Sequence, residues 1–190
     1  LIKNCSIKRN SASIGGGTVV DTCKVIAVIN SHFLLNSAID GGGGFYSKNT
    51  DKHFFVRNLF SGNEAFHGGS IYIISSDLSV IVFSHYNKNF ALDKGGCFFF
   101  MMMSKVTKTK VILNNNYFLN NKARSIGAVM YIDFANQVYF SSAKFSSTSK
   151  IFASTSFVNV HCTMLGFSKI LFEKLYDHVT ILDLDFGSTS

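Results

Sequence analysis

The chain has 190 residues, of which 47% are hydrophobic and 20 are Phe, with no Pro and no Trp. Its formal net charge of +7 comes from basic residues scattered along the chain. No RNP, helix-turn-helix or zinc-finger pattern accompanies them, which argues against nucleic acid as a partner. No apolar run is long enough to span a membrane.

A sequence unit recurs five times in chain order. It opens on an aromatic or aliphatic residue, has Asn three positions later and Ala two positions after that, and reaches Gly four positions further on. Its first residues are Ile7, Phe33, Phe60, Tyr86 and Phe118, and the same spacing continues to Phe145 and Phe172. A period of mostly 26–27 residues with short apolar runs and Gly/Asn turns predicts a solenoid of short strands.

The sequence therefore predicts an all-β fold, a right-handed parallel β-helix of about seven coils. We expect residues 1–190 to form a single domain, with regular repeats over 1–131 and degenerate coils over 132–190. Polar loops such as 47–52 join the expected strands.

Equivalent residues of successive coils should stack about 4.8 Å apart, which predicts three columns. The expected internal aromatic column contains Phe33, Phe60, Tyr86, Phe118, Phe145 and Phe172. The expected ladder of hydrogen-bonded amides contains Asn10, Asn36, Asn63, Asn89 and Asn121. The expected turn glycines, all in one register, are Gly16, Gly42, Gly69, Gly95 and Gly127.

Two positions after the Ala, the repeat carries side chains with acid/base chemistry. Asp40, His67 and Asp93 occupy this position in three successive coils, so neighbours should lie about 5 Å apart. They are the candidate catalytic residues, for general acid/base chemistry or for metal ligation. We prefer the other interpretation, a surface column of alternating charge that reduces repulsion, and expect that the protein is not an enzyme.

Near its start, the chain offers one modification site and one candidate disulfide. Asn4-Cys5-Ser6 is an N-glycosylation sequon. The four cysteines, Cys5, Cys23, Cys97 and Cys162, contain no C-x-x-C pair, which gives no support for a metal site, and no cofactor is expected. Either Cys5 pairs with Cys23, the nearest cysteine in sequence, or the thiols are free and buried.

The fourth coil contains a Phe/Met run over residues 98–103, followed by Lys105, Lys108 and Lys110. The run has the length of a buried strand, although it also fits an apolar edge that meets a partner. The lysines fit a solvated loop or, as the alternative, a site for an acidic glycan.

The Phe-x-x-Asn-x-Ala and Gly-Gly-x-x-Tyr elements resemble the repeats of polymorphic outer-membrane proteins and of related pectin-lyase-like parallel β-helices. The motif covers residues 2–131, and spacing alone extends it over 138–186. The resemblance implies a surface-exposed adhesin, a passenger domain or a structural repeat. For an enzyme with this fold, it implies cleavage of polysaccharides.

Repeat residues begin at Ile2 without a capping segment, and the last expected strand lies close to the end of the sequence. Either the sequence is a fragment of a longer protein, or it is an uncapped repeat unit whose ends are covered by neighbouring molecules. Open coil ends are templates for further strands, so we expect end-to-end self-association into a filament. The expected function is a non-enzymatic structural module of an extracellular or cell-surface protein. The alternatives are an adhesin fragment that binds a glycan or a host surface, and a polysaccharide lyase or hydrolase that uses Asp40, His67 and Asp93.

Overall fold

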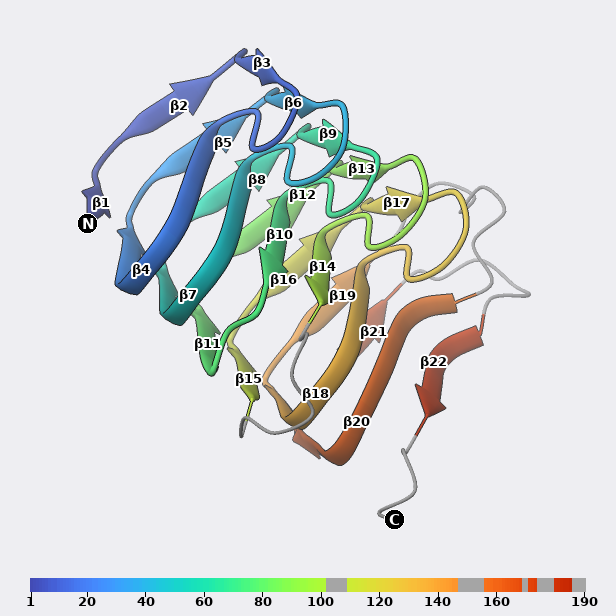
Figure 1. Cartoon of the computed structure of the whole chain (residues 1–190). Helices are drawn as coiled ribbons and strands as arrows, with labels where there is room; N and C mark the ends of the chain where they lie inside the picture. Colours follow the sequence, from blue (N-terminus) through green and yellow to red (C-terminus); the bar gives the residue numbers. More distant parts are fainter. Residues whose placement is uncertain (102–108, 147–155, 169–170, 174–179, 186–190) are drawn as a thin grey trace.

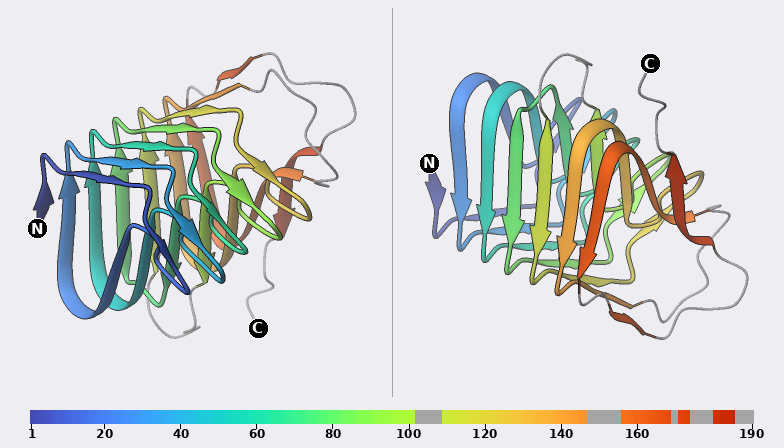
Figure 2. Two further views of the ribbon diagram at one scale, coloured as in Figure 1. Left: turned by 90° about the horizontal axis from the view of Figure 1, so that it is seen from above. Right: turned by 90° about the horizontal axis from the view of Figure 1, so that it is seen from below.

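The protein is a parallel β-solenoid, seen in a computed structural model that describes residues 1–101, 109–146, 156–168, 171–173 and 180–185 (Figure 1). Every strand pair in the described residues is parallel, and these residues contain no helix. The predicted fold class is confirmed. Figure 2 shows the coils stacked one behind another along a single axis.

Three parallel sheets form the walls of the solenoid. The long sheet contains β1 (Ile2–Lys3), β4 (Thr18–Ile29), β7 (Phe45–Val56), β10 (Ile71–Ile74), β11 (Leu78–Val82), β14 (Phe98–Met101), β15 (Lys110–Asn114), β18 (Met130–Ser141), β20 (Ser156–Ser168) and β22 (Thr180–Asp185). The middle sheet contains β2 (Ser6–Lys8), β5 (His32–Leu34), β8 (Leu59–Ser61), β12 (His85–Asn87), β16 (Tyr117–Leu119), β19 (Lys144–Ser146) and β21 (Leu171–Glu173). The short sheet contains β3 (Ser11–Ala12), β6 (Ser37–Ala38), β9 (Glu64–Ala65), β13 (Phe90–Ala91) and β17 (Lys122–Ala123).

The solenoid has about five turns, fewer than the seven that the spacing predicted. Five coils contribute a strand to all three sheets. β19 and β21 continue the middle sheet and bring Phe145 and Phe172 into register, but they add no strand of the short sheet in the described residues. The Asn, Ala and Gly of the repeat are missing from these later coils. The regular aromatic step therefore continues the stacking in the middle sheet.

Residues with left-handed backbone form the corners of each coil. Between the long and middle sheets the corner residues have φ of 47–56° and are Asn4, Asn30, Arg57, Phe83, Asn115 and Ser142. The next corner contains Arg9, Leu35, Gly62, Lys88 and Asn120. Such conformations favour Gly and Asn. The stacking of the sheets holds bulkier residues such as Phe83 in the same conformation.

The glycine-rich bend has two registers, and the prediction of one was wrong. The left-handed position is held by Gly15, Gly42, Gly68, Gly95 and Gly127. Gly16 and Gly69 lie one position later, where a Cβ on Gly69 would come within 2.4 Å of the carbonyl oxygen of Gly96. The first and third coils reach the bend one residue sooner after their Ala, which shifts their glycines.

An aromatic column fills the interior of the coils. It contains Phe33, Phe60, Tyr86, Phe118 and Phe145, all of them buried. The Phe33 and Phe60 rings are 4.5 Å apart between centroids and 6° from parallel, and stacked pairs continue the column to Phe145. The backbone of Phe172 pairs with that of Phe145, but its side chain lies outside the described part. The column gives the solenoid a continuous apolar core.

A ladder of Asn side chains runs beside the aromatic column. Asn63 donates from its backbone N–H and from Nδ2 to Oδ1 of Asn89, both over 3.0 Å, and Asn36 donates to Asn63 in the same way. Asn63 Nδ2 also donates to the carbonyl oxygen of Phe33 over 2.8 Å. Asn10 and Asn121 extend the pattern at either end. The Asn of the repeat therefore ties each coil to the next from inside.

A second polar ladder occupies another corner, and the sequence analysis missed it. Ser31 N–H donates to Asn58 Oδ1, Asn58 N–H to Ser84 Oγ, and Ser84 N–H to Asn116 Oδ1. All four side chains are buried. Their steps of 27, 26 and 32 residues match those of the aromatic column, a signal that could have found them. The alternation of Ser and Asn hid the column.

A buried histidine lies inside the curved part of the long sheet. The side chain of His53 is fully buried, with Nδ1 3.0 Å from Ser76 Oγ and Nε2 2.8 Å from Ser47 Oγ. Burial lowers the pKa of this imidazole to about 3. His53 is therefore neutral at pH 7 and is held there by hydroxyl groups.

Tyr86 is the only tyrosine among the described rings of the aromatic column, and its hydroxyl is buried without a hydrogen-bond partner. The nearby Ser84 hydroxyl already donates to Val82 O and accepts from Asn58 N–H. We expect Tyr86→Phe to raise the free energy of unfolding by about 1 kcal/mol, because an unpaired buried hydroxyl is removed and the ring is kept. Urea denaturation measures the change. Tyr117→Phe, on the half-buried outer side of β16, is the control and should leave stability within about 0.5 kcal/mol.

Candidate functional site

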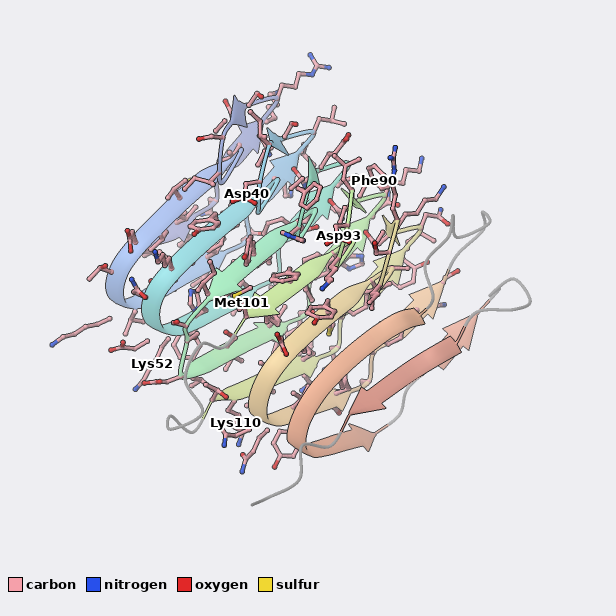
Figure 3. All side chains as sticks on the ribbon, turned by 45° about the vertical axis from the view of Figure 1, so that its right-hand side comes forward. Asp40, Lys52, Phe90, Asp93, Met101 and Lys110 are labelled. Carbon is pink, nitrogen blue, oxygen red and sulfur yellow. The ribbon has the colours of Figure 1, made fainter. Side chains whose placement is uncertain are left out.

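The candidate site lies at the glycine-rich bend, where the short sheet passes into the long sheet. Figure 3 shows Asp40 and Asp93 on the same side of the solenoid. His67 lies between them along the axis, because its N–H donates to Asp40 O and Asp93 N–H donates to Phe66 O. The three predicted residues thus lie on successive coils, but not in one register. His67 bridges to Gly41, one position after Asp40, because the third coil reaches the bend one residue sooner after its Ala.

The imidazole of His67 faces the carboxylate of Asp93. Nδ1 and Oδ2 are 3.6 Å apart, which is too long for a hydrogen bond, and Nδ1 has no other partner in the described structure. The two side chains are 21% and 25% exposed. Burial lowers the pKa of His67, although Asp93 and Asp40 act to raise it. Protonation of His67 would turn this contact into an ion pair with Asp93.

Aromatic rings of a second column pack against His67. We call it the outer aromatic column; it consists of Tyr46, Tyr72, Phe99 and Tyr131, and the first three are nearly buried. The His67 ring lies 4.8 Å from Phe99 and 6.1 Å from Tyr72 between centroids. Burial raises the pKa of Tyr72 to about 12, so this phenol is neutral across the physiological range.

Gly41 makes the site compact. A Cβ at this position would lie 1.8 Å from Cδ1 of Tyr72, so the backbone packs directly on the ring. Gly41 also pairs with His67 in an isolated parallel bridge. The rings of the outer aromatic column thus pack on one another and on the backbone, and the column forms a second, smaller core at the bend.

This arrangement has a limited chemical repertoire. One imidazole next to two carboxylates can accept and pass a proton. The described residues contain no group of three His, Cys, Asp or Glu side chains that could hold a metal ion. The histidines of a second outward column, His32 and His85, are exposed on the middle sheet, and His85 packs against Tyr117 instead of a carboxylate.

The remaining predicted residues lie apart from this site. Asn4 is an exposed corner residue whose Oδ1 accepts from Asn30 Nδ2 over 2.9 Å. Cys5 and Cys23 are free thiols in different columns, so the candidate disulfide is not formed, and Cys97 is free and buried. The side chain of Cys162 is outside the described part.

The Phe/Met run forms a strand from Phe98 to Met101 with three buried residues, in line with the buried-strand interpretation. Lys110 opens β15 and lies over the Tyr139 ring at 4.9 Å. Lys105 and Lys108 fall outside the described residues, so the proposed lysine cluster remains a prediction.

No family model, curated protein or solved structure matches the chain. The described residues contain no helix long and apolar enough to cross a membrane. The parallel β-solenoid itself therefore stands as the basis for a functional conclusion.

Proposed function

We propose that the chain is a non-enzymatic structural module, a rigid parallel β-helix within an extracellular or cell-surface protein. One observation carries this proposal: the side chains at the most strictly repeated positions point into the coil. The Asn ladder and the aromatic column are buried, and they hold coil to coil. A repeat of this kind favours shape and stiffness, whereas a binding repeat would fix residues on the outside.

The resemblance to polymorphic outer-membrane protein repeats supports the location. Asn4 lies exposed at a corner, where a glycan would meet no neighbouring side chain of the core. We propose that this position is glycosylated in a protein exported from the cell.

End-to-end self-association is the second part of the proposal. Asn10 Oδ1 receives no hydrogen bond in the described structure, whereas Oδ1 of Asn36 accepts two from Asn10. Among the described strands β2 pairs with β5 alone, so its alternate N–H and C=O groups on the other side have no strand partner there. A coil with the same repeat, stacked on this edge, would extend the ladders without a change of register.

Electron microscopy of the native material, together with intact mass spectrometry, tests this assembly. Fibres whose axial repeat equals one chain length of coils are expected. Discrete short rods, or a longer chain whose extra residues cover the edge of β2, would overturn the filament and favour an adhesin that binds a glycan or a host surface.

A second candidate function, cleavage of an acidic polysaccharide, is favoured by the approach of His67 to Asp93 at 3.6 Å. In that reaction His67 would act as the base and Asp93 would orient it. Incubation with polygalacturonate, followed by detection of new reducing ends or unsaturated products, tests the idea. Activity that disappears in Asp93→Ala with the fold intact would establish an enzyme and overturn the purely structural proposal.

A further inference from the structure

The later halves of β4, β7 and β18, together with β11 and β15, present an apolar outer side of the long sheet. We call this surface the lateral face and define it by the outward-pointing residues of β4, β7, β11, β15 and β18. Its first row is Val25, Lys52, Leu78, Lys110 and Gln137. Its central row is Ala27, Phe54, Val80, Ile112 and Tyr139, and its third row is Ile29, Val56, Val82, Asn114 and Ser141.

Burial shows that these side chains point away from the core. Along β11, Ser79 and Ile81 are buried, whereas Leu78, Val80 and Val82 remain half-buried, and β15 repeats the alternation. The central row is apolar in all five strands, and none of the three rows contains an acidic residue. A sheet face left to solvent is ordinarily polar. A continuous apolar row therefore marks a contact surface.

The size of the lateral face suits a pair of equal surfaces. With strands about 4.8 Å apart and about 6.8 Å between alternate residues, fifteen positions cover roughly 500 Å². Two such faces in contact would bury about 1,000 Å², the lower limit for a specific interface. A second copy of the chain is the occupant that supplies this area with matching apolar rows.

Charge selects the symmetry of the pair. A two-fold axis parallel to the strands would place Lys52 opposite Lys110 of the second copy, two like charges in one contact. An axis parallel to the solenoid instead places the first row opposite the third, so that Lys52 meets Val56 of the second copy. The lysine stem can then lie on apolar surface while its ammonium group reaches water.

We propose that the lateral face pairs with the same face of a second copy about a two-fold axis parallel to the solenoid axis. The central row then meets itself, with Val80 against Val80 and Ile112 against Ile112 of the second copy. The contact is isologous and closes as a dimer. It is independent of end-to-end stacking, which uses the edge of β2.

Sedimentation equilibrium of the chain over a range of concentrations tests the pairing. The wild type should show a weak monomer–dimer equilibrium, and Val80→Lys or Ile112→Lys should weaken it at least tenfold, because two added lysines, one from each copy, would face each other at the centre. Leu119→Lys, an outward substitution on the middle sheet, is the control and should leave the equilibrium unchanged. Circular dichroism and melting verify that each variant is folded.

A cysteine at the centre of the face tests the symmetry. In a Cys5→Ser background, Val80→Cys should form a disulfide-linked dimer under mild oxidation, whereas Ser61→Cys on the middle sheet should not. The proposal is overturned if the wild type stays monomeric at all concentrations and Val80→Cys forms no disulfide-linked dimer. It is also overturned if the dimer persists in Val80→Lys.

Two further measurements separate this proposal from other assemblies. Lys8→Pro removes an N–H on the open side of β2, so it should block end-to-end stacking and leave the lateral dimer intact. Monomeric protein that binds phosphatidylserine vesicles, and loses that binding in Val80→Lys, would assign the face to a lipid surface and overturn the dimer.

Discussion

Replacing Asn89 by Ala is expected to lower the free energy of unfolding by about 4 kcal/mol or more. Asn89 Oδ1 accepts from the backbone N–H and from Nδ2 of Asn63. Asn89 Nδ2 donates to Phe60 O and to Asn121 Oδ1. All these groups are buried, so the loss of one side chain leaves several donors and acceptors without partners. Guanidinium denaturation followed by circular dichroism measures the change.

Asn87 provides a matched control in the same coil. It has the same side chain, lies two residues earlier on the half-buried outer side of β12, and its Oδ1 makes no hydrogen bond. Because this Oδ1 is buried without a partner, Asn87→Ala should not lower the free energy of unfolding and should raise it by no more than about 1 kcal/mol. Similar losses for Asn87→Ala and Asn89→Ala would mean that the ladder does not hold the coils together.

Acid should destabilise the solenoid because it protonates His53 in the unfolded chain. The pKa of His53 is about 3 in the folded protein, below the ordinary value of 6.5. Between these values the unfolded state binds a proton that the folded state does not, so stability falls as the pH falls. From pH 7 to pH 4.5 the loss should reach roughly 2–3 kcal/mol, because each pH unit below 6.5 changes the free energy of unfolding by about 1.4 kcal/mol. Urea denaturation at a series of pH values measures this slope.

Two variants identify the residue responsible. His53→Phe removes this titrating group, so most of the slope should disappear, and a smaller slope from His67, whose pKa burial also lowers, should remain. Stability at pH 7 is lower in this variant because Ser47 and Ser76 lose their partner. His32→Gln changes an exposed histidine and should keep the wild-type slope. An unchanged slope in His53→Phe would assign the acid sensitivity to other groups.

The sequence was sufficient to predict the fold, because five units with the same Asn, Ala and aromatic spacing leave few ways to stack. It also placed His67 next to Asp93, although His67 lies one position out of the register of Asp40 and Asp93. The glycine register was wrong because a shift of one residue at a bend changes which glycine takes the left-handed conformation. Counting four residues from Ala12 or Ala65 to the expected glycine cannot detect that shift.

Other features depend on packing that no single motif encodes. The ladder of Ser31, Asn58, Ser84 and Asn116 uses two residue types that exchange hydrogen bonds equally well, so identity does not repeat although position does. His67 lies against Phe99 because the bend folds one coil onto the next, a contact that spacing along the chain does not reveal. The lateral face required knowledge of which side of each strand points outward.

The Asn ladder has a direction. At every described step, from Asn10 to Asn121, the amide donates toward the later coil and the carbonyl accepts from the earlier one. The amide dipoles therefore add along the described part of the row. Its first amide, Asn10, presents a carbonyl oxygen to the earlier side, and the last described amide, Asn121, presents its NH2 group to the later side. Any coil-on-coil contact that continues the row must be head to tail. Such contacts are polar and open-ended, so growth by them would give a fibre whose two tips differ.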